Sequence, residues 1–172
     1  MWETIADEAA AESRLWADAL LPSDERERDA VFSPLAEERY ALGLETIYEG
    51  YLVHYGRPRL FAPQDPDTDL LLGDYLYAHG LVRIASFRRV DAVSDLSELI
   101  SLSSQLRAEN GDGEGPLWAA TAALLGAGSR LDGPRAALRL HGDASPLEEA
   151  ARTAAGSEAV DVALAAHARR LR

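Results

Sequence analysis

The sequence contains no cysteine and no lysine. Without cysteine, the chain has no disulfide, no thiolate ligand for zinc and no cysteine nucleophile. Without lysine, it has neither a Schiff-base lysine nor the lysine of a phosphate-binding loop. All 17 basic residues are therefore arginines. The absence of cysteine fits a cytoplasmic protein, and cytoplasmic is the location we expect.

Long hydrophobic runs are also absent. The most apolar stretch, residues 70–85, is interrupted by Asp74 and Arg83. It is shorter than the run of about 20 apolar residues that crosses a membrane. The first residues are acidic rather than basic followed by apolar, so they do not resemble a signal peptide. We therefore expect no transmembrane segment.

Positive charge is scarce, with 17 basic against 29 acidic residues and a net charge of −12. This balance argues against nucleic acid or an anionic membrane as the main partner. The acidic excess lies in residues 1–50, which hold 13 acidic residues and 4 arginines. Solvated helix faces explain most of this excess, and an acidic docking face for a basic partner is the alternative.

Apolar residues recur at helical spacing along most of the chain, and no segment shows the two-residue alternation of a strand. With 172 residues, 47% of them hydrophobic, the chain can bury one core. The sequence predicts a single all-α domain over residues 1–172, a bundle of six to eight helices.

Prolines, glycines and capping residues place the predicted helices. Ser33 before Pro34 resembles an N-cap, and Asp65 or Asp67 is the expected cap of the central helix. The central group spans residues 33–108 and the C-terminal group residues 116–171. The expected helices are 3–20, 34–55, 66–87, 91–108, one of about 14 residues from Pro116, 134–140, 145–154 and 158–171.

The stretch Leu70–Ala85 is apolar nearly all round, which is typical of a helix wrapped by others. Gly73 and Gly80 are seven residues apart and share one face, and Gly43 and Gly50 have the same spacing in the preceding helix. Glycine inside a helix costs about 1 kcal/mol relative to alanine. Four glycines so placed predict that the two helices pack closely on each other.

Asp74 lies within this apolar stretch, where a carboxylate needs a partner, a metal, water or a shifted pKa. The densest group of carboxylates is Asp65, Asp67 and Asp69. It could hold Ca²⁺ or Mg²⁺, but it lacks the glycine and closing glutamate of an EF-hand loop. Capping of the following helix is the favoured interpretation. We expect neither a bound metal nor a cofactor.

The remaining polar motifs are sparse. Four histidines are scattered without metal-ligand spacing, so no catalytic residue is assigned. Arg57 and Arg59 flank Pro58 and could grip a phosphate as a fork, although ordinary surface arginines are the favoured alternative.

Gly73-Asp74-Tyr75-Leu76 resembles the GDxL segment that opens a buried helix in trans-polyprenyl diphosphate synthases. Upstream, Leu52-Val53-His54 and Gly56-Arg57-Pro58 resemble the segments around the aspartate-rich motif of that family. The aspartates themselves are missing, because Tyr55 and Gly56 stand in their place, and no second DDxxD follows.

The closer resemblance is to component 1, the non-catalytic small subunit of two-component heptaprenyl diphosphate synthases. Leu42-Gly43-Leu44-Glu45-Thr46 and Leu72-Gly73-Asp74-Tyr75-Leu76-Tyr77 fit the pattern of those subunits. The resemblance covers roughly residues 35–106 and implies the isoprenoid-synthase architecture without its metal chemistry.

The resemblance also implies a function: pairing with a catalytic trans-prenyltransferase subunit and shaping an apolar channel for the prenyl chain. Arg57 and Arg59 would be the contacts to the diphosphate. The residues expected to line the channel are Gly73, Asp74, Tyr75, Tyr77, Ala78, Gly80 and Leu81.

Two other interpretations remain open. One is a stand-alone helical protein, as a monomer or self-associated, that binds an apolar ligand or a protein partner. The other is an active metal-dependent prenyltransferase that uses Asp65, Asp67, Asp69 and Asp74. The last is the weakest, because a departing diphosphate needs several placed acids and cations.

Overall fold

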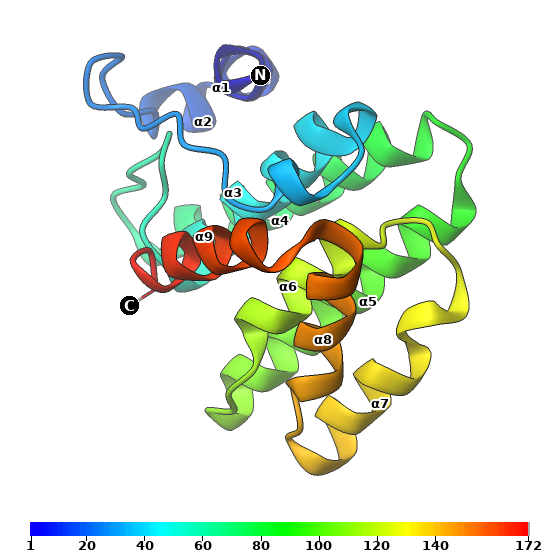
Figure 1. Cartoon of the computed structure of the whole chain (residues 1–172). Helices are drawn as coiled ribbons and strands as arrows, with labels where there is room; N and C mark the ends of the chain where they lie inside the picture. The colour runs from blue at the N-terminus through cyan, green and yellow to red at the C-terminus, as the bar shows by residue number, and fades with distance from the viewer. Residues whose placement is uncertain (172) are drawn as a thin grey trace.

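A computed structural model describes residues 1–171, and these residues form helices joined by loops, the longest of which leads from α2 to α3 (Figure 1). The predicted all-α class is confirmed for this part of the chain, where the only β pairings are two isolated bridges. The α-helices are α1 (Trp2–Glu12), α2 (Arg14–Asp18), α3 (Ala41–Tyr55), α4 (Pro66–Ala85), α5 (Val90–Glu109), α6 (Glu114–Ala123), α7 (Asp132–His141), α8 (Ser145–Ala155) and α9 (Ser157–Ala168).

The described residues thus contain nine α-helices rather than the predicted six to eight. The difference begins in the first predicted helix, which is divided at Ser13. Ser13 is extended, and its side chain accepts a hydrogen bond from the backbone N–H of Leu15 at 3.1 Å. A serine that caps a new helix in this way competes with continuation of the old one.

The segment before α3 also differs from the prediction. Ser33 does not cap a long helix, because residues Ser33–Leu35 and Glu38–Tyr40 form short 3-10 turns, η1 and η2. The backbone N–H of Ser33 instead donates to Glu45 Oε1 at 3.0 Å, and that of Val31 donates to the same oxygen at 3.1 Å. A buried carboxylate of α3 therefore holds the chain that leads into α3.

The start of α4 agrees with the sequence. Asp65 is the N-cap, and its Oδ1 accepts hydrogen bonds from the backbone N–H groups of Asp67 and Thr68 at 3.1 and 2.9 Å. Pro66 occupies the first helical turn. This arrangement satisfies donors that have no partner inside the helix.

The predicted close packing of α3 on α4 is confirmed. The helices run antiparallel, with Gly43 against Gly80 and Gly50 against Gly73. A Cβ atom on Gly50 would lie 2.8 Å from the carbonyl oxygen of Gly73, and one on Gly80 would lie 2.8 Å from that of Gly43. The glycines let the two backbones approach.

The expectation that residues 70–85 are wrapped on all sides is wrong for α4. It is α3 that is buried along nearly its whole length, from Gly43 to Val53. On α4, Leu71 and Val82 are 54% and 68% exposed. The helix therefore packs on α3 with one side and turns another side to solvent.

Two apolar clusters form the core. The larger joins α3, α5, α6, α8 and α9 around Trp118, and the smaller docks α1 and α2 onto α4 through Ile5 and Trp16. In Figure 1, α1 and α2 lie at the upper left, whereas α7 and α8 lie at the bottom. Among residues 1–171, we find no helix that combines the length and the apolar composition of a membrane span.

Candidate functional site

The region that carries the family resemblance is the α3–α4 pair with the turn between the two helices. Gly73 and Gly80 lie in the contact between these helices. A Cβ atom on Gly73 would overlap the imidazole ring of His54, and one on Gly80 would overlap Ile47. Both glycines are therefore occupied by helix packing, and an apolar ligand cannot lie against them without separating α3 from α4.

Asp74 has His54 as its partner. The Asp74 side chain is 66% exposed, and its Oδ1 lies 3.4 Å from Nε2 of His54. Burial lowers the pKa of His54 below its usual value, and the Asp74 carboxylate partly opposes that shift. The Asp74 carboxylate is therefore stabilised by contact with solvent and by its histidine partner.

The other predicted lining residues point to different sides of α4. Tyr75 stacks on Trp16 of α2 with ring centroids 5.7 Å apart, and Tyr77 is buried beside His54. Ala78 is exposed and Leu81 is half-buried. These side chains line none of five surface hollows of the described chain, so the structure shows no common cavity for them.

The turn after α3 separates the two arginines of the predicted fork. Arg57 is 60% exposed and pairs with Glu27 at 3.1 Å. Arg59 is completely buried: its Nε donates to Glu49 Oε2 at 2.8 Å and its Nη1 to Glu45 Oε2 at 2.6 Å. Arg59 is thus neither a surface arginine nor half of a phosphate fork.

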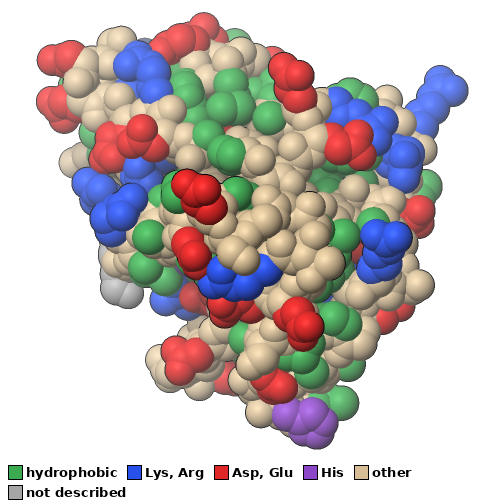
Figure 2. Space-filling view, in the orientation of Figure 1, with side chains coloured by type: hydrophobic (Ala, Val, Ile, Leu, Met, Phe, Trp, Pro, Cys, Tyr) green, Lys and Arg blue, Asp and Glu red, His purple; other side chains and the backbone are tan. Residues whose placement is uncertain are grey.

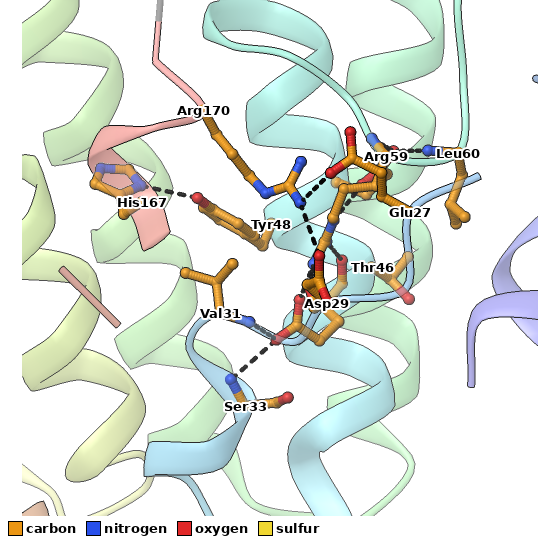
Figure 3. A network of polar contacts seen from close by, with 12 residues as sticks. Glu27, Asp29, Val31, Ser33, Thr46, Tyr48, Arg59, Leu60, His167 and Arg170 are labelled. Atoms are coloured by element: carbon orange, nitrogen blue, oxygen red, sulfur yellow. Dashed lines mark hydrogen bonds and ion pairs between the residues drawn. The ribbon is translucent and has the colours of Figure 1, made fainter. Parts of the chain in front are cut away.

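This buried network of Arg59, Glu45 and Glu49 is the main polar feature that the sequence analysis missed (Figure 3). Glu49 Oε1 accepts the backbone N–H groups of Arg59 and Leu60 at 2.7 and 2.8 Å. Because Glu45 Oε1 holds Val31 and Ser33, every carboxylate oxygen of the pair has a protein donor. One sequence signal was available: two glutamates four residues apart on an otherwise apolar helix require a cation.

Aromatic rings complete the surroundings of Arg59. Its guanidinium carbon lies 4.6 Å from the ring centroid of Trp2 and 5.0 Å from that of Tyr48. Such contacts favour a cation that has been removed from water. The network therefore ties α1, the segment before α3 and the turn after α3 to one helix.

A second buried contact joins Tyr48 of α3 to His167 of α9, with the Tyr48 hydroxyl 2.9 Å from Nδ1. Burial, with a smaller effect of Arg107, lowers the pKa of His167 to about 4. His167 is therefore neutral at pH 7. Among the described residues, its Nε2 has no hydrogen-bond partner.

These polar groups are arranged as ties between helices. Within residues 1–171, no three histidine or acidic side chains are grouped so that they could hold a metal ion. Asp65 is engaged in capping α4, as described above. The carboxylates of Glu45 and Glu49 offer no free oxygen to a ligand, because each oxygen already accepts a hydrogen bond.

The feature of the α3–α4 pair that is open to a partner is the outer face of α4. We use this name for Leu71, Ala78, Val82 and Ala85, which are all exposed and recur on one side of the helix. Leu71 and Val82 expose more than half of their surface. This face contains no arginine, and the exposed acidic residues Asp67 and Asp74 lie beside it.

The chain matches no family model, no curated protein and no solved structure. The relationship to isoprenoid synthases accordingly rests on the sequence motifs and stays a prediction.

Proposed function

We propose that this chain is a non-catalytic accessory subunit that docks onto a catalytic trans-prenyltransferase through the outer face of α4. The observation that carries the proposal is the exposure of Leu71 and Val82 on the helix that bears the Gly-Asp-Tyr motif. An apolar helix face in water favours a protein partner, because covering it removes apolar surface from solvent.

The prenyl channel would then lie at the interface between α4 and the catalytic subunit, and not inside this chain. Gly73 and Gly80 contact α3 and leave no space for a chain there. Ala78, between Leu71 and Val82, is small and exposed, so it can form one wall of an apolar channel whose other wall is the partner. The catalytic subunit supplies the metal and diphosphate chemistry, since the carboxylates of Glu45 and Glu49 are engaged inside this chain.

The test is affinity capture from the native cell extract with the full chain as bait, followed by mass spectrometry. We expect a trans-prenyltransferase subunit to be retained in a stoichiometric amount. The variant carrying Leu71→Glu and Val82→Glu should lose it, because two charges would be buried in the interface. Retention of no prenyltransferase, or of equal amounts by wild type and variant, would overturn the proposal.

Leu140→Glu is the matched control. Leu140 lies on α7 and is 71% exposed, so the substitution adds a charge to a comparable site outside α4. This variant should retain the partner as the wild type does. Loss of the partner from all variants would show an effect of charge alone and would also count against the proposed interface.

A further inference from the structure

Two adjoining surface hollows lie beside α9. The first, which we call the α9 hollow, has a volume of about 500 Å³ and lies between Val31 and Pro34 on one side and Val162 and Ala166 on the other. Its walls are mainly alanine, valine and proline side chains. Its volume falls in the range of about 300–1,000 Å³ that is usual for small-molecule sites.

The second, which we call the arginine hollow, has a volume of about 150 Å³. It shares Val31 and Ala166 with the α9 hollow, so the two hollows meet at these side chains. Beyond them, Arg57, Arg169 and Arg170 line the arginine hollow together with two acidic residues. An apolar surface therefore passes directly into a charged one.

Arg170 is the arginine of this hollow that is buried and held in place by acidic side chains. It is only 5% exposed, and its Nη2 donates to Glu27 Oε2 at 2.9 Å and lies 3.7 Å from Asp29 Oδ2. Figure 3 shows the guanidinium directed toward these two acids. Its Nη1 is buried and has no acceptor among residues 1–171. A buried donor without an acceptor is costly, so Nη1 has a hydrogen-bonding capacity that residues 1–171 leave unused.

The other arginines add positive charge at the same place. Arg169 is exposed and forms no ion pair within the described residues, whereas Arg57 is paired with Glu27. Three arginines against Glu27 and Asp29 leave the hollow with a net positive charge. In Figure 2, arginine side chains gather at the left edge of this face, beside the C-terminal end of α9 in Figure 1.

Backbone contacts fix this end of the chain. The backbone N–H of Arg57 donates to the carbonyl oxygen of Arg170 at 2.8 Å. A Cβ atom on Gly56 would lie 2.7 Å from that oxygen, so glycine is required for the close approach. The turn after α3 thus holds the arginines in position beside the apolar hollow.

We propose that the two hollows together bind a single-chain amphiphile with an anionic end. Its apolar tail lies along α9 between Val31 and Val162, and its terminal carboxylate or phosphate accepts hydrogen bonds from Arg169 and from Nη1 of Arg170. Arginine suits both head groups, because its planar guanidinium donates to two oxygens at once. This binding site shares no residue with the outer face of α4. The proposed amphiphile site is therefore independent of the proposed role as an accessory subunit.

The first measurement is isothermal titration of the purified full chain with dodecanoate and with dodecyl phosphate, each below its micelle concentration. We expect one site for at least one of the two. Binding of only dodecanoate would identify a carboxylate ligand, and binding of only dodecyl phosphate a phosphate ligand. Dodecanol, which has the tail without the charge, should bind at least about tenfold more weakly. Equal binding of dodecanol, or no binding of either anion, would overturn the proposal.

Variants test the location of the site. Arg169→Gln removes an exposed cation of the head-group end, and Val162→Asp places a charge in the tail end at a residue that is 66% exposed. Each should weaken binding about tenfold or more, with an unchanged circular dichroism spectrum. Arg130→Gln, a change at an exposed arginine outside both hollows, should bind as the wild type does. Wild-type affinity in both site variants would show that the amphiphile binds elsewhere.

Discussion

Gly50 of α3 lies so close to Gly73 of α4 that a Cβ atom on Gly50 would be 2.8 Å from the Gly73 carbonyl oxygen. The obstacle is a backbone atom in the middle of a helix, and it cannot rotate away as a side chain could. The separation of α3 and α4 is therefore set by the absence of side chains at these positions.

Replacing Gly50 by alanine should destabilise the protein by about 1–3 kcal/mol, because the two helices must move apart to admit a methyl group. The gain in helix propensity, about 1 kcal/mol for alanine over glycine, opposes this loss without cancelling it. Urea denaturation monitored by circular dichroism gives the difference in the free energy of unfolding.

Gly133→Ala is the control for that experiment. Gly133 lies in the first turn of α7, and a Cβ atom there would meet no other atom within 4 Å. This change should leave the stability equal or slightly higher. If Gly50→Ala were as well tolerated as Gly133→Ala, the helix contact would not be as close as described.

The α3–α4 contact was predictable because its signal is periodic. Glycines seven residues apart in two successive helices mark one face of each, and a short connection makes the helices antiparallel neighbours. The cap of α4 by Asp65 was predictable for a similar reason, since it involves residues adjacent in the sequence. The helix contact and the cap could thus be predicted because their sequence signals are local or repeated.

The surroundings of Arg59 were not predictable in the same way. Its partners Glu45 and Glu49 lie 14 and 10 residues earlier, and the turn that brings them together has no repeating pattern. Arginine is usually exposed, so the spacing of Arg57 and Arg59 favoured a surface pair. The channel-lining residues were misleading for a related reason: they are close in sequence, but Gly73 packs against α3, whereas Tyr75 stacks on Trp16 of α2 and Ala78 is exposed.

Replacing Arg59 by leucine should destabilise the protein strongly, by about 3–5 kcal/mol, because Glu45 and Glu49 would remain buried without a cation. Both glutamates and the arginine are fully buried, so solvent offers little compensation. Thermal and urea unfolding of the variant measure the loss.

A rescue experiment distinguishes the cost of the unpaired charges from the cost of altered packing in Arg59→Leu. Adding Glu45→Gln and Glu49→Gln to Arg59→Leu removes both orphaned charges and keeps side chains of nearly the same shape. We expect the triple variant to recover part of the lost stability. A triple variant less stable than Arg59→Leu alone would show that the glutamates are not destabilising in the absence of the arginine.

Asp65→Ala should lower the melting temperature more than Asp67→Ala. The Thr68 hydroxyl donates to Asp65 Oδ2, and the backbone N–H groups of Thr68 and Asp67 donate to Oδ1. These bonds, the hydroxyl bond first, lower the pKa of the Asp65 carboxyl, so the cap remains ionised in mildly acidic solution. Asp67 lies in the first turn and contributes only its charge. A rise in the wild-type melting temperature with Mg²⁺ or Ca²⁺, lost in Asp65→Ala, would instead indicate a metal site.

Acid should destabilise the protein partly through His167. An unfolded histidine has a pKa of about 6.5, whereas burial lowers the pKa of His167 in the folded chain to about 4. Between these two pH values the unfolded chain binds more protons, so the free energy of unfolding rises with pH and falls as the solution is acidified. Integrated over the window, the contribution of His167 is about 3 kcal/mol.

The measurement is urea denaturation of the wild type and of His167→Gln at intervals from pH 4 to pH 7. Glutamine keeps a polar group near the Tyr48 hydroxyl and does not titrate, so the variant should show a smaller fall in stability across this range. His141→Gln, a change at an exposed histidine, should follow the wild type because its ring stays in water in both states. The three proteins have the same acidic residues, so a difference between the curves is assigned to the histidine that was replaced. Parallel curves for His167→Gln and the wild type would mean that His167 does not become charged on unfolding, contrary to its burial between α3 and α9.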